Sequence, residues 1–340
     1  MSRIQDALKH LISGDSLGFG QMQDVMRQIM LGEATPAQIG ALLVALRLKG
    51  ETVAEIAAAA SVMRELATPV HLIVPDAIDI VGTGGDGVST FNVSTASALV
   101  AAAAGVPVAK HGNRAVSSRS GSADVLEAAG VNLNLTPEQM AACIEETGIG
   151  FLYAPLHHSA MRHAAGPRRE LGIRTIFNLL GPLTNPAGTR RQVVGVYDRR
   201  WLEPVAQVLA QLGSLHVLAI HADDGLDEIS LGATTHYVEW RDGELTQGQL
   251  TPEAFGLQPV PSQHFQVADA AASLAIIQAV LQGVPSPAAD LVSLNAAAAL
   301  YVAGQVPDLA SGLARAQEIL RSGAAARKLE QLVEFTQQYA

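Results

Sequence analysis

The chain has 340 residues and a formal net charge of −10, and 49% of its residues are apolar although only 4% are aromatic. This length suffices for one large domain or two smaller ones, and the Ala- and Leu-rich composition favours a mostly helical or α/β protein. The negative charge argues against a sequence-independent polyanion binder, which needs a basic field, so we expect no nucleic-acid partner.

The N-terminus MSRIQDALKH lacks the apolar core of a signal peptide, and no apolar run approaches ~18 residues. We therefore expect a cytoplasmic protein without a membrane segment. The single cysteine, Cys143, cannot form an intramolecular disulfide. It stands in the apolar stretch MAACI, which predicts a buried structural thiol rather than a nucleophile.

Residues 1–70 predict a small N-terminal domain of four helices without a strand. The stretches Thr35–Gln38 and Thr52–Glu55 each have the form of a capping box, which marks a helix start. The helix that begins at the first of them is expected to end at Gly50.

Residues 73–330 predict a large α/β domain with a mainly parallel central sheet covered by helices. Short apolar runs alternate there with helical stretches, as in successive βα units. The runs span residues 78–81, 106–109, 151–154, 193–197 and 217–220. A surface hairpin is expected around residues 235–244, and the chain is helical again from about Val267. We also expect the 160–185 region to pack on the helical domain.

The stretch GTGGDGVST, residues 82–90, follows the first apolar run and precedes a helix expected at 96–104. Glycines bring backbone N–H groups close to a ligand, and a helix start adds positive partial charge, so this loop predicts phosphate binding. Further donors come from Thr90, Asn92, Ser94 and Thr95. A capped strand-to-helix turn is the structural alternative.

Gly82, Gly84 and Gly87 also match the letters of the dinucleotide fingerprint G-x-G-x-x-G. That motif requires a helix that starts within it and an acidic residue about twenty residues on. Here the helix starts later, and Lys110-His111 stands where the acid should be. A P-loop is excluded as well, because no Lys-Ser/Thr pair closes the stretch.

A second loop rich in phosphate-directed donors follows the second strand. It comprises KHGNRAVSS at residues 110–118 and Arg119–Ser122, before a helix expected at 123–129. Cations, hydroxyls and glycine-exposed amides at two successive strand ends indicate a ligand with two phosphate groups or an extended one. His111 is expected to pack or to hydrogen-bond rather than to shuttle protons.

Three histidines, His157, His158 and His163, follow the third strand, but their spacing is not that of a zinc site. We expect His158 and Arg162 to be i,i+4 neighbours on one helix. The pair Arg168-Arg169 is either an exposed face or directs a guanidinium at a carboxylate.

Four carboxylates stand within residues 223–228, after the fifth strand. Such close acids repel one another unless a cation binds, and Mg²⁺ takes oxygen ligands together with substrate phosphates. Asp227-Glu228 is the better candidate pair, because apolar Leu226 and Ile229 should hold it against the core. A solvated acidic turn is the alternative. With the phosphate loops, this pair predicts a magnesium-dependent reaction of a phosphosugar or nucleotide and leaves the acceptor open.

Several of these motifs resemble, in the same order, those of the anthranilate phosphoribosyltransferase family, which is structurally related to the pyrimidine nucleoside phosphorylases. They are GTGGDG at 82–87, NVST at 92–95, KHGNRAVSS at 110–118, Arg168, GIRTIFNLLGPL at 172–183 and GLDEIS at 225–230. The resemblance covers most of the chain.

The resemblance implies transfer of the phosphoribosyl group of phosphoribosyl pyrophosphate to the amine of anthranilate. The products would be N-(5-phosphoribosyl)anthranilate and pyrophosphate, in tryptophan biosynthesis. It further implies Mg²⁺, with two ions per monomer, and a helical domain hinged to an α/β domain in a homodimer.

Residue roles are implied as well, with no side chain acting as a discrete nucleophile or base. Phosphoribosyl pyrophosphate would be bound by Gly82, Gly85, Asp86, Thr90, Asn92, Val93, Ser94, Thr95, Lys110, His111, Gly112, Asn113, Arg114, Ala115, Val116, Ser117, Ser118 and Ser122. Anthranilate would be contacted by Gly82, Asn113 and Arg168. Magnesium would be held by Ser94, Asp227 and Glu228.

One stretch departs from the family pattern F-A-P-x-x-H-P-A-M-K. Ser159 stands for the proline and Arg162 for the lysine, which leaves the roles of Tyr153 and His158 open. Two alternatives remain: an enzyme like the pyrimidine nucleoside phosphorylases, and a nucleic-acid-binding paralogue without transferase activity. The second expects a basic surface and a degraded acidic pair, whereas the net charge here is negative and Asp227-Glu228 is intact.

Overall fold

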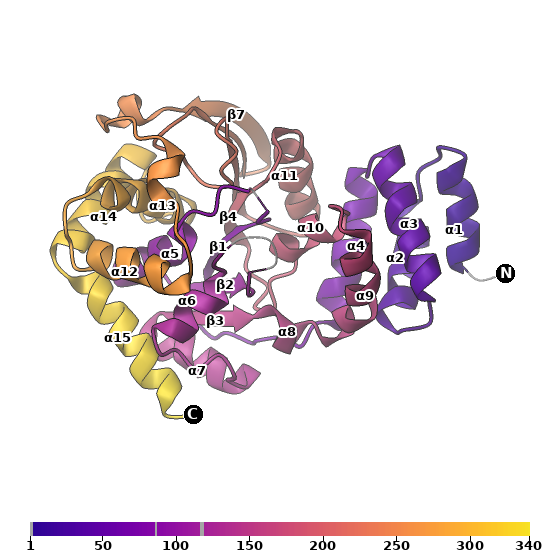
Figure 1. Ribbon diagram of the computed structural model, residues 1–340, viewed down its shortest axis with the longest axis horizontal. Coiled ribbons are helices and arrows are strands. Elements are labelled where there is room, and N and C mark those ends of the chain that lie inside the picture. Colours follow the sequence, from indigo (N-terminus) through magenta and orange to yellow (C-terminus); the bar gives the residue numbers. More distant parts are fainter. Residues whose placement is uncertain (1–2, 86, 116–118) are drawn as a thin grey trace.

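The computed structural model describes residues 3–85, 87–115 and 119–340, and it begins with a bundle of four helices. They are α1 (Arg3–Ile12), α2 (Phe19–Met30), α3 (Pro36–Lys49) and α4 (Val53–Leu66). Both predicted capping boxes form: the Thr35 hydroxyl accepts from the Gln38 N–H at 3.3 Å, and the Thr52 hydroxyl accepts from the Glu55 N–H at 3.2 Å. These caps satisfy donors that the first helical turn leaves free. The bundle forms the right-hand end of the molecule in Figure 1.

A seven-stranded sheet follows, in the order β3-β2-β1-β4-β5-β6-β7. The predicted parallel part is confirmed by β1 (Ile78–Gly82), β2 (Val108–Gly112), β3 (Ile149–Tyr153), β4 (Arg191–Gly195) and β5 (His216–Ala222). The predicted hairpin is confirmed as β6 (Thr235–Arg241) and β7 (Glu244–Leu250), which extend the sheet in antiparallel fashion. The order of the strands reverses between β1 and β4, where open α/β sheets bind ligands beyond the carboxyl ends of their strands.

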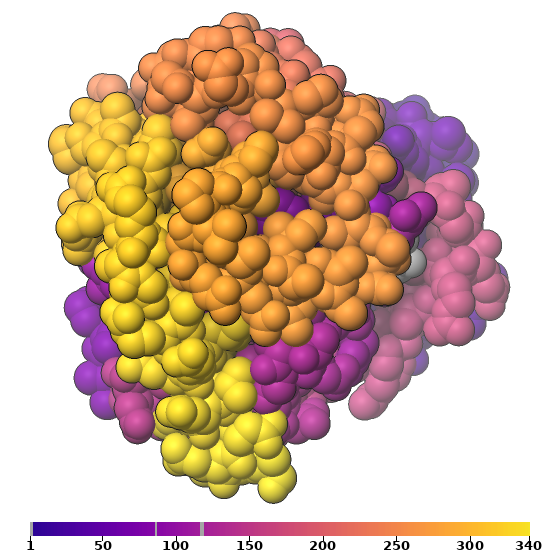
Figure 2. Space-filling view, turned by 60° about the vertical axis from the view of Figure 1, so that its left-hand side comes forward, coloured from indigo at the N-terminus to yellow at the C-terminus, as the bar shows by residue number. Residues whose placement is uncertain are grey.

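Helices cover both faces of the sheet, because side chains alternate between two apolar cores along each strand. Val193 and Leu218 belong to the first core, whereas their neighbours Val194 and Val217 belong to the second. The first core also contains residues of α5 (Val93–Ala103), α6 (Ser122–Ala128), α7 (Pro137–Thr147), α12 (Ala270–Leu281), α13 (Pro287–Val302), α14 (Leu309–Arg321) and α15 (Ala324–Gln337). In Figure 2 the C-terminal third of the chain, in orange and yellow, covers most of the visible face, and the helical bundle lies behind it.

The second core joins the sheet to the helical bundle. It contains residues of α1 to α4 together with residues of α11 (Leu202–Gln211) and of the segment that follows β3. That segment comprises α8 (Ala154–His157), α9 (Arg162–Leu171) and α10 (Phe177–Leu180). α9 packs against α2 and α3, and α10 packs against α4. The bundle and the α/β part therefore share one continuous apolar interior.

Two expectations about helix boundaries were wrong. α5 begins at Val93 rather than at residue 96, because the first helical bond already runs from the Ala96 N–H to the Asn92 carbonyl at 3.1 Å. His158 and Arg162 are not neighbours on one helix, because α8 ends at His157 and a 3₁₀ turn at residues 159–161 separates it from α9.

Other 3₁₀ turns lie at residues 181–183, 199–201, 252–255 and 262–265. Cys143 is fully buried, as predicted, and burial raises the pKa of its thiol to about 12. Among the described residues, no helix combines the length and the apolar character that crossing a membrane requires.

Candidate functional site

A cavity of about 660 Å³ opens at the carboxyl ends of β1, β2, β4 and β5. It brings together most of the predicted site residues: Gly82, Gly85, Thr90, Asn92, Ser94, Lys110, His111, Gly112, Asn113, Arg114, Ala115, Ser122, Arg168, Asp227 and Glu228. Val93 and Thr95 do not line it, since both are buried in the first turn of α5. The predictions for Asp86, Val116, Ser117 and Ser118 lie outside the described residues.

The acidic turn packs directly on the glycine loop. The Gly84 N–H donates to Asp227 Oδ2 at 2.8 Å, and the Ser94 N–H at the start of α5 donates to Glu228 Oε1 at 3.0 Å. This approach requires glycine at position 82, because a Cβ there would overlap the Asp227 carboxylate. These N–H groups bind carboxylate oxygens here, so this edge of the loop is one that accepts anionic groups.

The turn that carries the acidic pair is rigidly held. Leu226 and Ile229 are buried, as predicted from their apolar character. Asn295 of α13 accepts from the Ile229 N–H at 2.9 Å and donates to the Ile229 carbonyl at 2.9 Å. Asn295 also lines the cavity and was missed from the sequence. An amide side chain within the otherwise mostly apolar stretch LVSLNAAAAL was the available signal.

Lys110 forms the floor of the cavity. Its side chain is nearly fully buried, and its ammonium donates to the Ile80 carbonyl at 2.6 Å and to the Ser94 hydroxyl at 3.2 Å. Burial lowers the pKa of Lys110, while the carboxylates of Asp79 and Glu228 act against that shift. A cation thus lies directly beneath the acidic pair and the start of α5.

The second loop is shaped by Asp124, another residue that the sequence did not single out. Asp124 Oδ2 accepts from the N–H groups of Ala115 and Gly121, each at 2.9 Å. The Arg114 guanidinium turns toward the same helix, where it binds Glu127 at 2.7 and 2.9 Å. These acidic partners raise the pKa of Arg114. The backbone of this loop, more than the Arg114 side chain, therefore faces the cavity.

Asn92 ties the two loops together. Its Oδ1 accepts from the hydroxyls of Ser120 and Ser273, each at 2.8 Å, and its Nδ2 donates to the Ser120 carbonyl at 3.3 Å. Asn92 therefore holds the end of the second loop beside the start of α5.

Two buried imidazoles lie side by side in the wall of the cavity. The rings of His111 and His158 have centroids 5.1 Å apart. Burial lowers the pKa of His158 to about 4 and that of His111 well below its ordinary value. Both rings are therefore neutral at pH 7 and cannot act as proton-donating acids there.

Arg168 and Met63 of the helical bundle border the other end of the cavity. The Arg168 guanidinium lies 5.1 Å from the centre of the Phe177 ring, and burial lowers its pKa. No carboxylate of the described chain forms an ion pair with it. Met63 of α4 lines the same cavity, so the bundle contributes to the site, which the sequence did not reveal.

The oxygen atoms near the glycine loop fit a hard divalent cation. Ser94, Asp227 and Glu228 line the same cavity and supply one hydroxyl and two carboxylates. Within the described ranges, no cluster of three or more His, Cys, Asp or Glu side chains could hold a metal ion. A donor set of this size suits Mg²⁺, which completes its shell with water and substrate phosphates.

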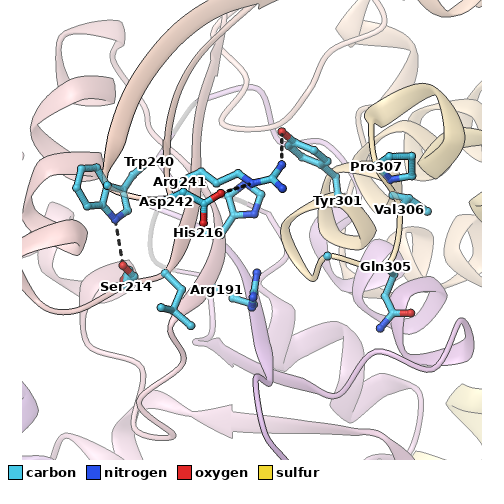
Figure 3. Close-up of a pocket in the computed structure, with 13 residues that line it drawn as sticks. Arg191, Ser214, His216, Trp240, Arg241, Asp242, Tyr301, Gln305, Val306 and Pro307 are labelled. Carbon is cyan, nitrogen blue, oxygen red and sulfur yellow. Dashed lines mark hydrogen bonds and ion pairs between the residues drawn. The ribbon is translucent and has the colours of Figure 1, made fainter.

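A second cavity, of about 700 Å³, lies at the opposite edge of the sheet (Figure 3). Several polar groups in or beside it are bonded to one another, although Arg191 Nε and Ser214 Oγ have no hydrogen-bond partner within the described residues. Glu239 accepts from His216 at 2.7 Å and from the Tyr301 hydroxyl at 2.8 Å, and Arg241 donates to that hydroxyl at 3.2 Å. Arg191 donates to the Val302 carbonyl at the end of α13 at 2.9 Å.

Comparisons with known proteins agree with the geometry of the first cavity. The profile of the glycosyl transferase family, a/b domain, matches residues 74–326, and that of the glycosyl transferase family, helical bundle domain, matches residues 5–67. The anthranilate phosphoribosyltransferase of Thioalkalivibrio sulfidiphilus is 59% identical over 98% of both chains. That of Alkalilimnicola ehrlichii is 56% identical over 98% of this chain and 99% of the relative.

Solved structures show the same fold. Anthranilate phosphoribosyltransferase from Thermus thermophilus superposes with a TM-score of 0.93 at 48% identity, over 98% of this chain and 99% of that one. The enzyme from Saccharomyces cerevisiae in complex with PRPP and Mg has a TM-score of 0.91 at 28% identity, over 98% of both chains. The chain therefore belongs to this glycosyl transferase family and, within it, to the anthranilate phosphoribosyltransferases.

Proposed function

We propose that this chain transfers the phosphoribosyl group of phosphoribosyl pyrophosphate to the amine of anthranilate, releasing N-(5-phosphoribosyl)anthranilate and pyrophosphate in tryptophan biosynthesis. One observation carries the proposal. The glycine loop, the start of α5, Lys110 and the Asp227-Glu228 pair meet in a single cavity that Arg168 borders. The relatives described above bear the name of this transferase, which favours it over a nucleoside phosphorylase or a nucleic-acid-binding paralogue.

The phosphoribosyl donor binds between the two loops. The N–H groups of the glycine loop and of the first turn of α5 receive its phosphates, since backbone donors at a helix start favour anions. Lys110 adds a positive charge beneath them, and the loop that Asp124 holds supplies further backbone donors. Donors and positive charge at this place stabilise the departing pyrophosphate.

Magnesium binds at Ser94, Asp227 and Glu228, with two ions per monomer. When bound there, Mg²⁺ would supply positive charge against the leaving pyrophosphate. The yeast enzyme named above was solved with PRPP and Mg, and the oxygen donors of this chain suit the same ion. The carboxylates that now accept from Gly84 and Ser94 are the groups that orient toward it.

Anthranilate binds at the Arg168 end of the cavity. A guanidinium that no acid of the described chain neutralises suits the anthranilate carboxylate. Gly82 and Asn113 line the same cavity, where they contact the aromatic ring of anthranilate. A yeast relative was solved with 4-fluoroanthranilate. Because an aromatic amine is neutral at pH 7, orientation rather than a general base prepares it for attack on the ribose.

The direct test follows anthranilate fluorescence in the presence of phosphoribosyl pyrophosphate and Mg²⁺. The signal should fall only when all three components and the protein are present, and omission of any one is the control. An unchanged signal, or cleavage of a pyrimidine nucleoside that depends on phosphate, would refute the assignment.

A homodimer forms through the helical bundle. The bundle exposes several large apolar side chains, with Leu48 83% exposed, Ile12 78%, Leu31 58% and Phe19 45%. Apolar surface of this kind marks protein interfaces when it is clustered. Light scattering of wild type and of Leu48→Lys tests this, since a monomeric wild type would refute it. A cytoplasmic location stays a prediction.

A further inference from the structure

β1 and β2 stop pairing before they reach the substrate cavity. Their register holds one pair, Ile78 with Val108, although β1 pairs with β4 at five positions and β2 pairs with β3 at five. A regular parallel ladder would continue by joining the His111 N–H to the Ile80 carbonyl and the Ile80 N–H to the Ala109 carbonyl.

Three buried side chains bind these backbone groups in place of the ladder: Asp79, Lys110 and Asn185, here called the polar wedge. Asp79 Oδ1 accepts from the His111 N–H at 3.1 Å. Asn185 Nδ2 donates to the Ala109 carbonyl at 2.8 Å and to Asp79 Oδ2 at 2.7 Å. The Lys110 ammonium donates to the Ile80 carbonyl at 2.6 Å.

The polar wedge is almost entirely buried. Asp79 is 0% exposed, and Lys110 and Asn185 are each 3% exposed. Buried polar groups of this kind are costly when a partner is missing, so the three side chains stabilise one arrangement of the strand ends together. Paired strands lie ~4.8 Å apart, and a β2 paired with β1 to its end would close the gap that the Lys110 side chain now crosses.

We propose that Asp79 is a positioning residue for phosphoribosyl transfer. At the centre of the polar wedge, it holds the end of β2 away from β1 and thereby sets the place of the loop that starts at Gly112. Gly112, Asn113 and Ala115 of that loop line the cavity. Asp79 itself does not line it, so its action on the donor is exerted through the loop. This inference rests on the proposed function.

Asp79→Asn tests the proposal with little change of volume. If the new amide oxygen still accepts from the His111 N–H, its NH₂ group faces the Asn185 NH₂ group. Two donors then face each other, and the hydrogen bond between these side chains is lost. We expect the KM for phosphoribosyl pyrophosphate to rise about tenfold, with a smaller change in the KM for anthranilate. Calorimetry with phosphoribosyl pyrophosphate and Mg²⁺ should show the same loss as a weaker Kd.

Asn185→Ser removes a different part of the polar wedge and should give the same kinetic signature, which keeps the test open if Asp79→Asn folds poorly. The KM of the double variant for phosphoribosyl pyrophosphate should be at most about twice that of the more affected single variant, because substitutions in residues that act as a unit are non-additive. Thr336→Val is the matched control: this buried hydroxyl of α15 accepts from the Asn132 N–H at 3.1 Å, and Thr336 does not line the cavity.

A donor KM and Kd within twofold of wild type in both single variants would overturn the proposal. So would an equal rise in Thr336→Val at matched loss of melting temperature, because the effect would then reflect stability alone. A wild-type chain that binds the donor but transfers nothing to anthranilate would instead refute the proposed acceptor, and the calorimetric Kd values would still decide the role of Asp79.

Discussion

The two cavities at opposite edges of the sheet have similar volumes, about 660 and 700 Å³, but different chemistry. At the amino edge of the parallel strands, Arg241 binds Asp242 and the Tyr301 hydroxyl (Figure 3), and Glu239 beside the cavity accepts from His216 and from that hydroxyl. At the carboxyl edge, the glycine loop, the start of α5, Lys110 and the Asp227-Glu228 pair meet in one cavity, and Arg168 has no acidic partner among the described residues. The kind of polar group that lines a cavity therefore marks a site, and volume alone does not mark it.

The carboxylates of Asp79, near the carboxyl edge, and Glu239, near the amino edge, have pKa values shifted in opposite directions. Burial raises the pKa of Asp79 to about 6, and neighbouring Lys110 and Asn185 only partly oppose it. Burial also acts on Glu239, but there the hydrogen bonds from His216 and Tyr301 prevail and lower its pKa. The charged form of Asp79 is therefore disfavoured by its surroundings, whereas the charged form of Glu239 is stabilised by its partners.

The largest effect is expected from substitutions that remove one carboxylate charge of the Asp227-Glu228 pair. Asp227→Asn or Glu228→Gln should lower kcat by about 10²- to 10³-fold, because charge on the leaving pyrophosphate would lose stabilisation. Initial rates at saturating substrates and varied Mg²⁺ measure this. The control is Asp223→Asn, which alters a carboxylate of the same turn that binds His236 at 2.9 Å. Equal losses in the control would contradict the distinction within the turn.

The next effect concerns the acceptor. Arg168→Ala should raise the KM for anthranilate about 10- to 100-fold and leave that for phosphoribosyl pyrophosphate nearly unchanged, since it removes a charge-assisted bond to the carboxylate alone. Arg169→Ala, a change at the exposed neighbour, serves as the control. Comparable increases for both substrates would show that Arg168 does not distinguish them.

The pH dependence of stability should have opposite signs at the two carboxylates. A raised pKa means that Asp79 contributes stability below its unfolded value of 3.8, which is lost as pH rises through about 6. Relative to Asp79→Asn, the wild type should thus lose about 2 kcal/mol between pH 4 and 7. Urea unfolding at several pH values measures this.

Glu239→Gln gives the comparison. A lowered pKa means that Glu239 contributes stability above the ordinary value of 4.5, which is lost as pH falls through its folded value. The wild type should therefore gain on this variant as pH rises from acid to 4.5. The same slope in both variants would remove the difference between the two edges.

The smallest effect is expected from a substitution at the amino edge of the sheet, away from the substrate cavity. Tyr301→Phe removes the hydroxyl that joins Glu239 to Arg241 and should cost about 1 kcal/mol of stability. Both KM values and kcat should stay within twofold of wild type. Thermal unfolding and steady-state kinetics check this, and a changed KM would show that the two cavities are coupled.

Local patterns in the sequence predicted most of the fold and the outline of the site. Capping boxes, apolar runs and glycine spacing act over a few residues, so Thr35, Thr52 and the 82–90 stretch could be interpreted directly. The start of α5 and the break at His158 were wrong, because both depend on packing that overrides local propensity.

The polar wedge could not be predicted from the sequence, for a different reason. Asp79 stands in the run IDIV, which reads as an ordinary strand, and its partner Asn185 lies 106 residues further on. The separation of β1 from β2 is visible only when both strands are placed. Asn295 and Met63 could not be predicted for the same reason, since Asn295 binds a turn 66 residues before it and Met63 belongs to the helical bundle. Asp124 acts on the loop just before its own helix, at separations of three and nine residues, but its residue type alone does not indicate that role.

The continuous second core has a consequence for unfolding. Arg64 of α4 donates to the Leu183 carbonyl at 2.7 Å and to the Leu212 carbonyl at 3.3 Å, across the same apolar interior. Detaching the bundle would expose that interior and leave this nearly buried guanidinium without its acceptors. The N-terminal helices should therefore melt together with the sheet in one calorimetric transition, and a fragment of residues 1–70 should be far less stable than its four well-capped helices suggest.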